Sequence, residues 1–168
     1  RYHAADNMTD RSAALAILAG SAFAERTAAL EDFYQRFQKD PLVLDKWLAL
    51  EAVVPAAETL DRVRTLLNHP AFSMANPNRV RALVGSFAGG NQTQFNRLDG
   101  AGYQFLADFV IALDRRNPQT AARLLVSFRS WRALEPHRRA LAESALRSVA
   151  AVGDLSTDTR DIVSRTLA

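Results

Sequence analysis

Four segments of the sequence repeat one spacing of apolar residues, and this spacing limits the possible fold more than any other feature. Apolar side chains recur at steps of three, four and seven residues, which places them on one face of an α-helix. The four sets are Leu30/Phe33/Tyr34/Phe37, Val80/Leu83/Val84/Phe87, Leu106/Phe109/Val110/Leu113 and Ala121/Leu124/Leu125/Phe128. No segment alternates apolar and polar residues long enough for a convincing strand. We therefore predict helices throughout the chain.

Short polar residues followed by proline mark the predicted helix starts. Their side-chain oxygens can accept hydrogen bonds from first-turn N–H groups, and proline at the first helical position loses only an N–H without an intrahelical partner. The clear starts are Asp40-Pro41, Asn76-Pro77 and Asn117-Pro118, and the weaker ones are Val54-Pro55 and Glu135-Pro136. The expected stops are Gly20, Asn68-His69-Pro70, Gly89-Gly90-Asn91 and Gly153. These signals predict about eight or nine helices.

The clear proline-marked starts lie 36 and 41 residues apart, and each interval holds two predicted helices. This spacing is similar to the period of roughly 40 residues in HEAT and armadillo helix-pair repeats. The intervals are unequal, however, and the units are not alike in sequence. We expect residues 1–168 to form a single all-α segment of antiparallel helix pairs, stacked as an irregular armadillo- or HEAT-like superhelix.

Composition narrows the class of protein. Hydrophobic residues make up 48% and charged residues 23% of the chain, which is typical of a soluble globular domain. No apolar run approaches the roughly 20 residues that a membrane-spanning helix needs, and a net charge of +3 is too small to argue for nucleic acid. We thus expect neither a membrane nor a nucleic-acid partner. The absence of cysteine permits a reducing cytoplasm but leaves the cellular compartment open. The location that we expect is nevertheless cytoplasmic.

No metal or cofactor site is expected in this chain. Zinc hydrolysis on a helix needs two histidines one turn apart with a glutamate between them, and His3, His69 and His137 are far apart in sequence. We favour a structural role for His69 at a helix end and a solvated position for His137. No serine lies in a Gly-x-Ser-x-Gly elbow, and the glycines lack the spacing of a phosphate-binding loop.

A group of arginines could contact phosphate, but glutamates are interleaved among them, and we favour a solvated face. This group is Arg129, Arg132, Arg138, Arg139 and Arg147. A basic helical nucleic-acid binder remains an open alternative that predicts strongly salt-dependent binding.

One polar pair is a candidate for ligand binding. Asn117-Pro118 begins a predicted helix on which Gln119 and Arg123, four residues apart, share a face away from the apolar stripe. An amide, free N–H groups and an arginine at a helix start could meet the carbonyls or the carboxylate of a peptide. Hydrogen bonds within or between helices are the favoured alternative on sequence alone.

Five sequence motifs in the same order resemble the tail of M1-family zinc aminopeptidases of the aminopeptidase N type. They are Tyr2-His3-Ala4-Ala5-Asp6-Asn7-Met8-Thr9-Asp10-Arg11, Asp45-Lys46-Trp47, Asn76-Pro77-Asn78-Arg79-Val80-Arg81 followed by Gly85-Ser86-Phe87-Ala88-Gly89, Asp99-Gly100-Ala101-Gly102-Tyr103 and Arg116-Asn117-Pro118-Gln119. The resemblance covers the whole chain. It implies the later part of a C-terminal helical domain that closes over the catalytic domain of the same polypeptide. The start at Arg1, without methionine or signal-peptide features, also suggests a piece of a larger multidomain enzyme.

The resemblance implies an enzyme that removes N-terminal amino acids from peptides with one zinc ion held by earlier domains. The His-Glu-x-x-His ligands are missing here, so we expect this segment to be non-catalytic and inactive alone. Gln119 would line the pocket for the first side chain of the peptide substrate, and Arg123 would contact the peptide beyond the scissile bond. For the Asn76 to Arg81 stretch we favour a structural cap. The alternative is a free-standing helical-repeat module that binds protein partners.

Overall fold

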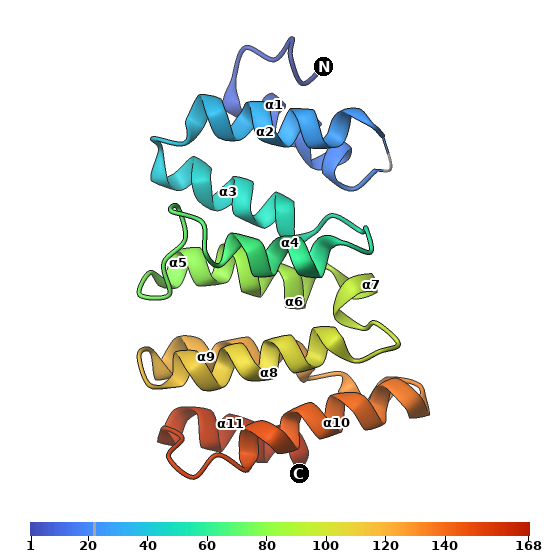
Figure 1. Ribbon diagram of the computed structural model, residues 1–168, viewed down its shortest axis with the longest axis vertical. Coiled ribbons are helices and arrows are strands. Elements are labelled where there is room, and N and C mark those ends of the chain that lie inside the picture. Colours follow the sequence, from blue (N-terminus) through green and yellow to red (C-terminus); the bar gives the residue numbers. More distant parts are fainter. Residues whose placement is uncertain (22) are drawn as a thin grey trace.

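A computed structural model describes residues 1–21 and 23–168, and its helices stack in layers along the longest axis, with the two termini at opposite ends (Figure 1). The α-helices are α1 Met8–Ala19, α2 Glu25–Phe37, α3 Pro41–Ala52, α4 Thr59–Leu66, α5 Pro77–Val80, α6 Ser86–Gly90, α7 Gln92–Phe95, α8 Ala101–Asp114, α9 Pro118–Leu124, α10 Pro136–Ala150 and α11 Thr157–Leu167. A π-helical segment, Arg81–Gly85, joins α5 to α6, and 3-10 turns at Leu125–Phe128 and Trp131–Ala133 follow α9.

The predicted all-α stack of helix pairs is confirmed. Helices α1 and α2, α3 and α4, α8 and α9, and α10 and α11 pack as pairs, while α10 also packs on α8 and α11 on α9. Since α5 and α6 are continuous through the π-helical segment, the described residues contain ten helices, slightly more than the eight or nine expected. The single turn α7 has no apolar stripe of its own and gave no sequence signal.

The predicted proline-marked starts are confirmed at three helices. Side chains of Asp40, Asn76 and Asn117 accept hydrogen bonds from first-turn N–H groups of α3, α5 and α9. The weaker start at Glu135 is confirmed too, because its carboxylate accepts from two N–H groups of α10. The start at Val54-Pro55 was wrong: α4 begins at Thr59.

The hydrogen bonds of the Val54 carbonyl explain why no helix begins at Val54-Pro55. This carbonyl accepts hydrogen bonds from the Thr59 hydroxyl at 2.7 Å and from the buried side-chain amide of Asn91 at 2.8 Å. The Asn91 amide also donates to the Ala52 carbonyl, and its oxygen caps α7. One buried asparagine therefore satisfies the end of α3 and the start of α7, fixing two layers against each other.

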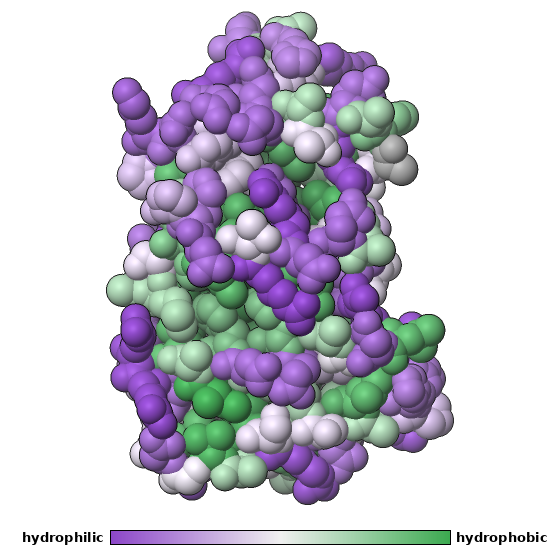
Figure 2. All heavy atoms as spheres, in the orientation of Figure 1, coloured by the Kyte–Doolittle hydropathy of each residue, from purple (hydrophilic) through white to green (hydrophobic). Residues whose placement is uncertain are grey.

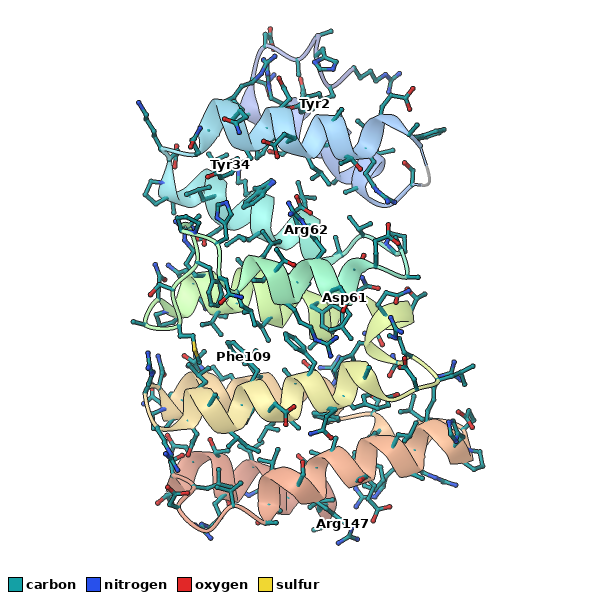
Figure 3. All side chains as sticks on the ribbon, viewed as in Figure 1. Tyr2, Tyr34, Asp61, Arg62, Phe109 and Arg147 are labelled. Atoms are coloured by element: carbon teal, nitrogen blue, oxygen red, sulfur yellow. The ribbon has the colours of Figure 1, made fainter. Side chains whose placement is uncertain are left out.

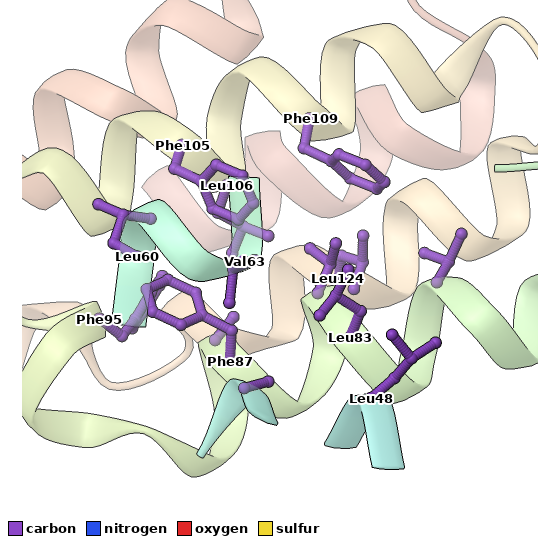
Figure 4. Packing of buried hydrophobic residues seen from close by; sticks show 14 of the residues in the cluster. Leu48, Leu60, Val63, Leu83, Phe87, Phe95, Phe105, Leu106, Phe109 and Leu124 are labelled. Atoms are coloured by element: carbon purple, nitrogen blue, oxygen red, sulfur yellow. The ribbon is translucent and has the colours of Figure 1, made fainter. Parts of the chain in front are cut away.

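The four apolar stripes meet in one hydrophobic core. All residues of the second and third stripes are buried, and Figure 4 shows Leu83, Phe87 and Leu124 lying close to Phe105 and Phe109 of α8. In the first stripe, Tyr34 and Phe37 are only partly buried. The fourth stripe is buried but crosses from α9 into the 3-10 turn. The core extends from Tyr2 to Val163.

The face of the molecule seen in Figure 2 is mostly hydrophilic in its upper part, whereas apolar residues reach the surface from the middle into the lower part. On this face Arg62 of α4, labelled in Figure 3, donates from Nε and Nη2 to the Glu51 carboxylate at 3.0 and 2.9 Å. Glu51 is buried, so this two-point contact compensates a charge removed from water. Among the described helices, none combines the length and apolar character needed to cross a bilayer.

Gly102, near the start of α8, packs directly on the backbone that leaves α7. A Cβ at this position would lie 2.3 Å from the Phe95 carbonyl oxygen and 2.8 Å from that of Gln94. We predict that Gly102→Ala lowers the free energy of unfolding by about 3 kcal/mol, because backbone must move to admit a methyl group. Chemical denaturation measures the change.

Gly89→Ala is the matched control for that substitution. No atom lies within 4 Å of a Cβ at Gly89, so the variant should keep or slightly raise the stability through its better helix propensity. Equal stability of Gly102→Ala and Gly89→Ala would contradict the close approach at Gly102.

Asp114 joins the end of α8 to the start of α11. Asp114 is 2% exposed, and its carboxylate accepts hydrogen bonds from the Ser156 N–H at 2.7 Å and hydroxyl at 2.5 Å. Burial alone would raise the pKa of Asp114, but the hydrogen bonds from Ser156 outweigh it and hold the pKa below the ordinary value of 3.8. The charged form is therefore the one that the fold stabilises.

A pKa lowered by folding contributes stability above the unfolded pKa, and this stability is lost as the pH falls through the folded pKa. We predict that Asp114→Asn lowers the free energy of unfolding by about 2 kcal/mol at pH 7. Denaturation at several pH values should also show a weaker acid dependence for the variant below about pH 4. Asp154→Asn, which removes only an exposed ion pair with Arg115, should leave both almost unchanged.

Candidate functional site

A cavity of about 530 Å³ opens between the helix formed by α5, the π-helical segment and α6 on one side and α9 with its following turns on the other. In Figure 1 these helices lie behind α4 and α8. The volume is within the usual range for small-ligand sites, which is about 300–1,000 Å³. Residues of α7 and the start of α8 complete the walls.

Helix α9 carries both of the residues predicted from the sequence, Gln119 and Arg123, but only one of them lines the cavity. Asn117 accepts a hydrogen bond from the Thr120 N–H at 3.0 Å, and Pro118 occupies the first helical position. Arg123, in the last turn, lines the cavity. Gln119 is exposed on the first turn and does not line it. Only one of the two predicted residues therefore reaches this cavity.

Two further arginines line the same cavity. Arg81 begins the π-helical segment and donates to the side-chain oxygen of Asn78, and Arg129 follows the first 3-10 turn. The side chains of Arg123 and Arg129 have no hydrogen-bond or ion-pair partner among residues 1–21 and 23–168. No aspartate or glutamate of this described part lines the cavity. The walls thus carry three positive charges without a negative one.

Sequence reasoning missed Arg81 and Arg129 as cavity residues. We interpreted the Asn76 to Arg81 stretch as a structural cap, and Asn76 does cap α5. Arg79 of the same stretch is buried and donates to the Asp45 carboxylate and to the Pro41 carbonyl. Arg81 instead lies on the exposed side of its helix. No signal in the sequence distinguishes these two arginines, because their surroundings come from different parts of the chain.

Aromatic side chains form much of the apolar wall. The rings of Phe95, Tyr103 and Phe128 pack against one another with centroids 5.2 to 6.0 Å apart, and all three are buried. The Tyr103 hydroxyl donates to the Asn96 side-chain oxygen at 2.8 Å, and burial raises the pKa of this hydroxyl. Trp131 also lines the cavity, and its indole N–H donates to the Thr166 carbonyl. These contacts fix the neutral, largely buried part of the cavity lining.

The π-helical segment shapes the helix that faces α9. The Ser86 N–H donates to the Arg81 carbonyl five residues earlier, which is the wider spacing of a π-helical turn. Gly85 lies on this turn, where a Cβ would be 3.8 Å from a methyl carbon of Leu124. This is an ordinary van der Waals distance, so the two helices are in contact here and both line the cavity. Such turns are frequently found at functional sites.

The histidines have structural surroundings. His69 accepts a hydrogen bond from the Ala71 N–H and its ring packs against Tyr34 and Trp47, as the structural interpretation predicted. For His137 the expectation of a merely solvated side chain was incomplete, because its Nε2 lies 2.8 Å from the Leu98 carbonyl oxygen. No group of three or more metal-binding side chains occurs in the described part of the chain.

The arginine group between positions 129 and 147 is not one solvated face. Arg132 donates to the carbonyls of Thr166 and Leu167 and lies over the Trp131 ring, and Arg138 donates to the Asn96 carbonyl. These two side chains therefore hold neighbouring segments together. Arg147 pairs with Glu143 on the exposed surface, as expected for a solvated helix face.

Comparison with known proteins places this fold in a family. Residues 1–168 match the protein family described as "Domain of unknown function (DUF3458_C) ARM repeats". Aminopeptidase N of Haemophilus influenzae is 41% identical over 99% of the chain, and aminopeptidase N of Escherichia coli is 38% identical over all of it. Both matches cover 19% of the relative's own length.

A solved structure is also similar. The crystal structure of Legionella pneumophila aminopeptidase A in complex with aspartic acid superposes with a TM-score of 0.88 and 34% sequence identity. The match covers 96% of this chain and 19% of that one, so the chain spans about a fifth of the length of its relatives. The chain belongs to the DUF3458_C family of ARM-repeat domains and corresponds to the C-terminal domain of aminopeptidase N.

Proposed function

We propose that this chain is the non-catalytic helical domain of an M1-family zinc aminopeptidase that releases N-terminal amino acids from peptides. Its role is to help enclose the active-site cavity and to position the peptide. The names of the relatives and the whole-chain matches to about a fifth of their length support this assignment. The partner is then the catalytic domain of the same polypeptide, and we also propose a cytoplasmic location.

The residues described here do not fit a zinc site. Hydrolytic zinc needs three protein ligands held together, and His3, His69 and His137 lie in different layers of the stack without a cluster of carboxylates. The zinc ion of the proposed enzyme would be held by earlier domains. The contribution of this chain is confined to binding and orientation of the peptide.

The position of Arg123 in the cavity is the observation that carries the proposal. Its side chain is exposed and lines a concave site, and no carboxylate of the described chain neutralises it. A guanidinium in this position can donate hydrogen bonds to the carbonyls of a peptide that enters the cavity. Gln119 lies one turn earlier on the same helix, where its exposed amide could contact the peptide outside the cavity.

Positioning residues affect the reaction through the geometry of the bound peptide. Contacts beyond the scissile bond reduce the freedom of the peptide relative to the catalytic groups, which lowers the barrier without supplying any chemistry. The benefit depends on substrate length. In this proposal a peptide extends beyond the scissile bond to Arg123, whereas a single-residue arylamide does not.

Substitution of Arg123 in the full-length enzyme tests the proposal. We predict that Arg123→Ala lowers kcat/KM for peptides about tenfold more than for a single-residue arylamide, which corresponds to the loss of one charge-assisted hydrogen bond. Gln119→Ala should show a smaller loss on both substrates. Steady-state kinetics on matched peptides and arylamides measure both ratios.

Arg139→Ala provides the control. Arg139 is an exposed arginine of α10 outside the cavity, so its removal changes the net charge equally without touching the proposed site. Its kinetics should match the wild type on both substrates. Equal losses on peptides and arylamides in Arg123→Ala would contradict the positioning role. The alternative is a domain that only binds protein partners, and it predicts that removing Arg123 affects neither substrate.

A further inference from the structure

A second cavity, of about 390 Å³, opens between α2 and α4, and the end of α3 completes its walls. Helices α2 and α4 lie on the near side in Figure 1, whereas the helices around the first cavity lie behind α4 and α8. Within the described part of the chain, the two cavities share no lining residue. The volume of the second cavity is also within the usual range for small-ligand sites.

The buried part of this second lining is mainly apolar. Leu30 of α2 and Val54, which follows α3, line the cavity and are almost completely buried. The buried Thr59 hydroxyl is satisfied by the Val54 carbonyl, so it does not need a ligand. Since Asn91 also donates to this carbonyl, the backbone at Val54 is held in place. A small apolar group could therefore lie on Leu30 and Val54 without meeting an unsatisfied polar atom.

Charges of both signs surround the apolar lining. Helix α2 contributes Arg26 and Glu31, and the start of α4 contributes Glu58 and Arg62. The Arg26 Nη2 lies 3.6 Å from a carboxylate oxygen of Glu58. The hydrogen bonds that Arg62 donates to Glu51 raise the pKa of its guanidinium, and the nearby charge of Glu31 acts in the same direction. Each of the two facing helices thus presents one positive and one negative side chain.

The pair formed by Arg26 and Glu58 is the loose one. Arg62 is held by a two-point contact with Glu51, but 3.6 Å between Arg26 and Glu58 is longer than a hydrogen bond. Arg26 donates from Nη1 to the Ser21 carbonyl at 2.9 Å, while its Nη2 has no hydrogen-bond acceptor among residues 1–21 and 23–168. Only 17% of the Arg26 side chain is exposed, against 72% for Glu58. A largely buried guanidinium and a mobile carboxylate are therefore available side by side.

This combination favours a small zwitterion over a simple ion. Glu58 would repel a purely anionic ligand, and Arg26 would repel a purely cationic one. A carboxylate and an ammonium group on one carbon, as in a free α-amino acid, can meet both at once. The carboxylate would accept charge-assisted hydrogen bonds from Arg26, and the ammonium group would donate to Glu58. An apolar side chain on the same carbon would cover Leu30 and Val54.

We propose that the cavity between α2 and α4 binds a free α-amino acid with an apolar side chain, with Arg26 at its carboxylate and Glu58 at its ammonium group. The proposed function adds a source for this ligand, because an aminopeptidase releases such amino acids, and that link alone rests on the proposed function. An amino acid bound between α2 and α4 leaves the cavity of Arg123 free. The product of the enzyme would then have a site apart from the path of the peptide.

The test measures binding of L-leucine to the full-length enzyme by isothermal titration calorimetry. A competitive inhibitor blocks the catalytic site beforehand, so that leucine cannot bind there. We expect one further leucine per chain, with a Kd of about 0.1 to 1 mM. L-Leucine amide lacks the carboxylate and N-acetyl-L-leucine lacks the ammonium group, and each should bind about tenfold more weakly. Glycine, which lacks the apolar side chain, should bind more weakly by about the same factor or more.

Two variants and one control locate the site. Arg26→Gln should make leucine and leucine amide bind about equally, because the partner of the carboxylate is gone. Glu58→Gln should do the same for leucine and N-acetyl-leucine. Arg64→Gln loses a charge on the same helix outside the cavity, where Arg64 pairs with Asp61 on the surface, and should keep both wild-type ratios. Because each ratio compares ligands on one preparation, partial misfolding of a variant does not imitate the result.

Three outcomes would overturn the inference. The first is the absence of a further leucine site on the blocked enzyme. The second is a wild-type enzyme that binds leucine amide or N-acetyl-leucine as tightly as leucine, since the site would then accept a simple ion. The third is a pair of ratios that stay unchanged in Arg26→Gln and Glu58→Gln.

This proposal and the proposed function fail differently. The titration requires no turnover, so a failure to bind leucine leaves the positioning role of Arg123 intact. Equal losses on peptides and arylamides in Arg123→Ala would contradict the positioning role and leave the measured binding of leucine unaffected.

Discussion

The structure depends on the burial of apolar helix faces between layers. A single helix pair cannot bury its own apolar surface completely. Only the stacking of one pair on the next removes this surface from water. The resulting core runs from Tyr2 at one end of the stack to Val163 at the other. Leu83 and Phe87 on one layer and Leu124 on the next belong to it. The same packing that buries these residues sets α6 beside α9, and the cavity lies along this junction.

Buried polar groups determine how the layers fit together. Apolar faces alone allow some sliding, because the hydrophobic effect has no direction. Asn91 and Asp114 each join segments about 40 residues apart through hydrogen bonds whose geometry admits one arrangement. Glu51 of α3 joins the neighbouring helix α4 by accepting hydrogen bonds from Arg62. Each of these groups would be costly to bury without its partners, so the partners specify the register of the stack.

The cavity acquires its charge from segments that are separate in sequence. Arg81 lies 42 residues before Arg123, and Arg129 follows on a turn. The glutamates that are interleaved with arginine in the sequence are used elsewhere: Glu135 caps α10, and Glu143 pairs with Arg147. Local sequence therefore indicates a balanced, solvated surface, whereas the fold brings three arginines without carboxylate partners to the two sides of one cavity. Only Arg123 was anticipated there, through its place on the Asn117-capped helix.

The amino-acid sequence alone determined most of the helices. Apolar spacing, capping side chains and helix-ending residues are signals that act over only a few neighbouring residues. The caps at Asp40, Asn76 and Asn117 are local hydrogen bonds and were predictable. Tertiary structure decided two other features. No helix begins at Val54-Pro55, where the Val54 carbonyl accepts a hydrogen bond from Asn91. Arg123 lines the cavity, whereas Gln119 on the same helix does not. Both outcomes depend on groups brought from distant segments. Spacing along one helix fixes which side chains share a face, but only packing decides what that face meets.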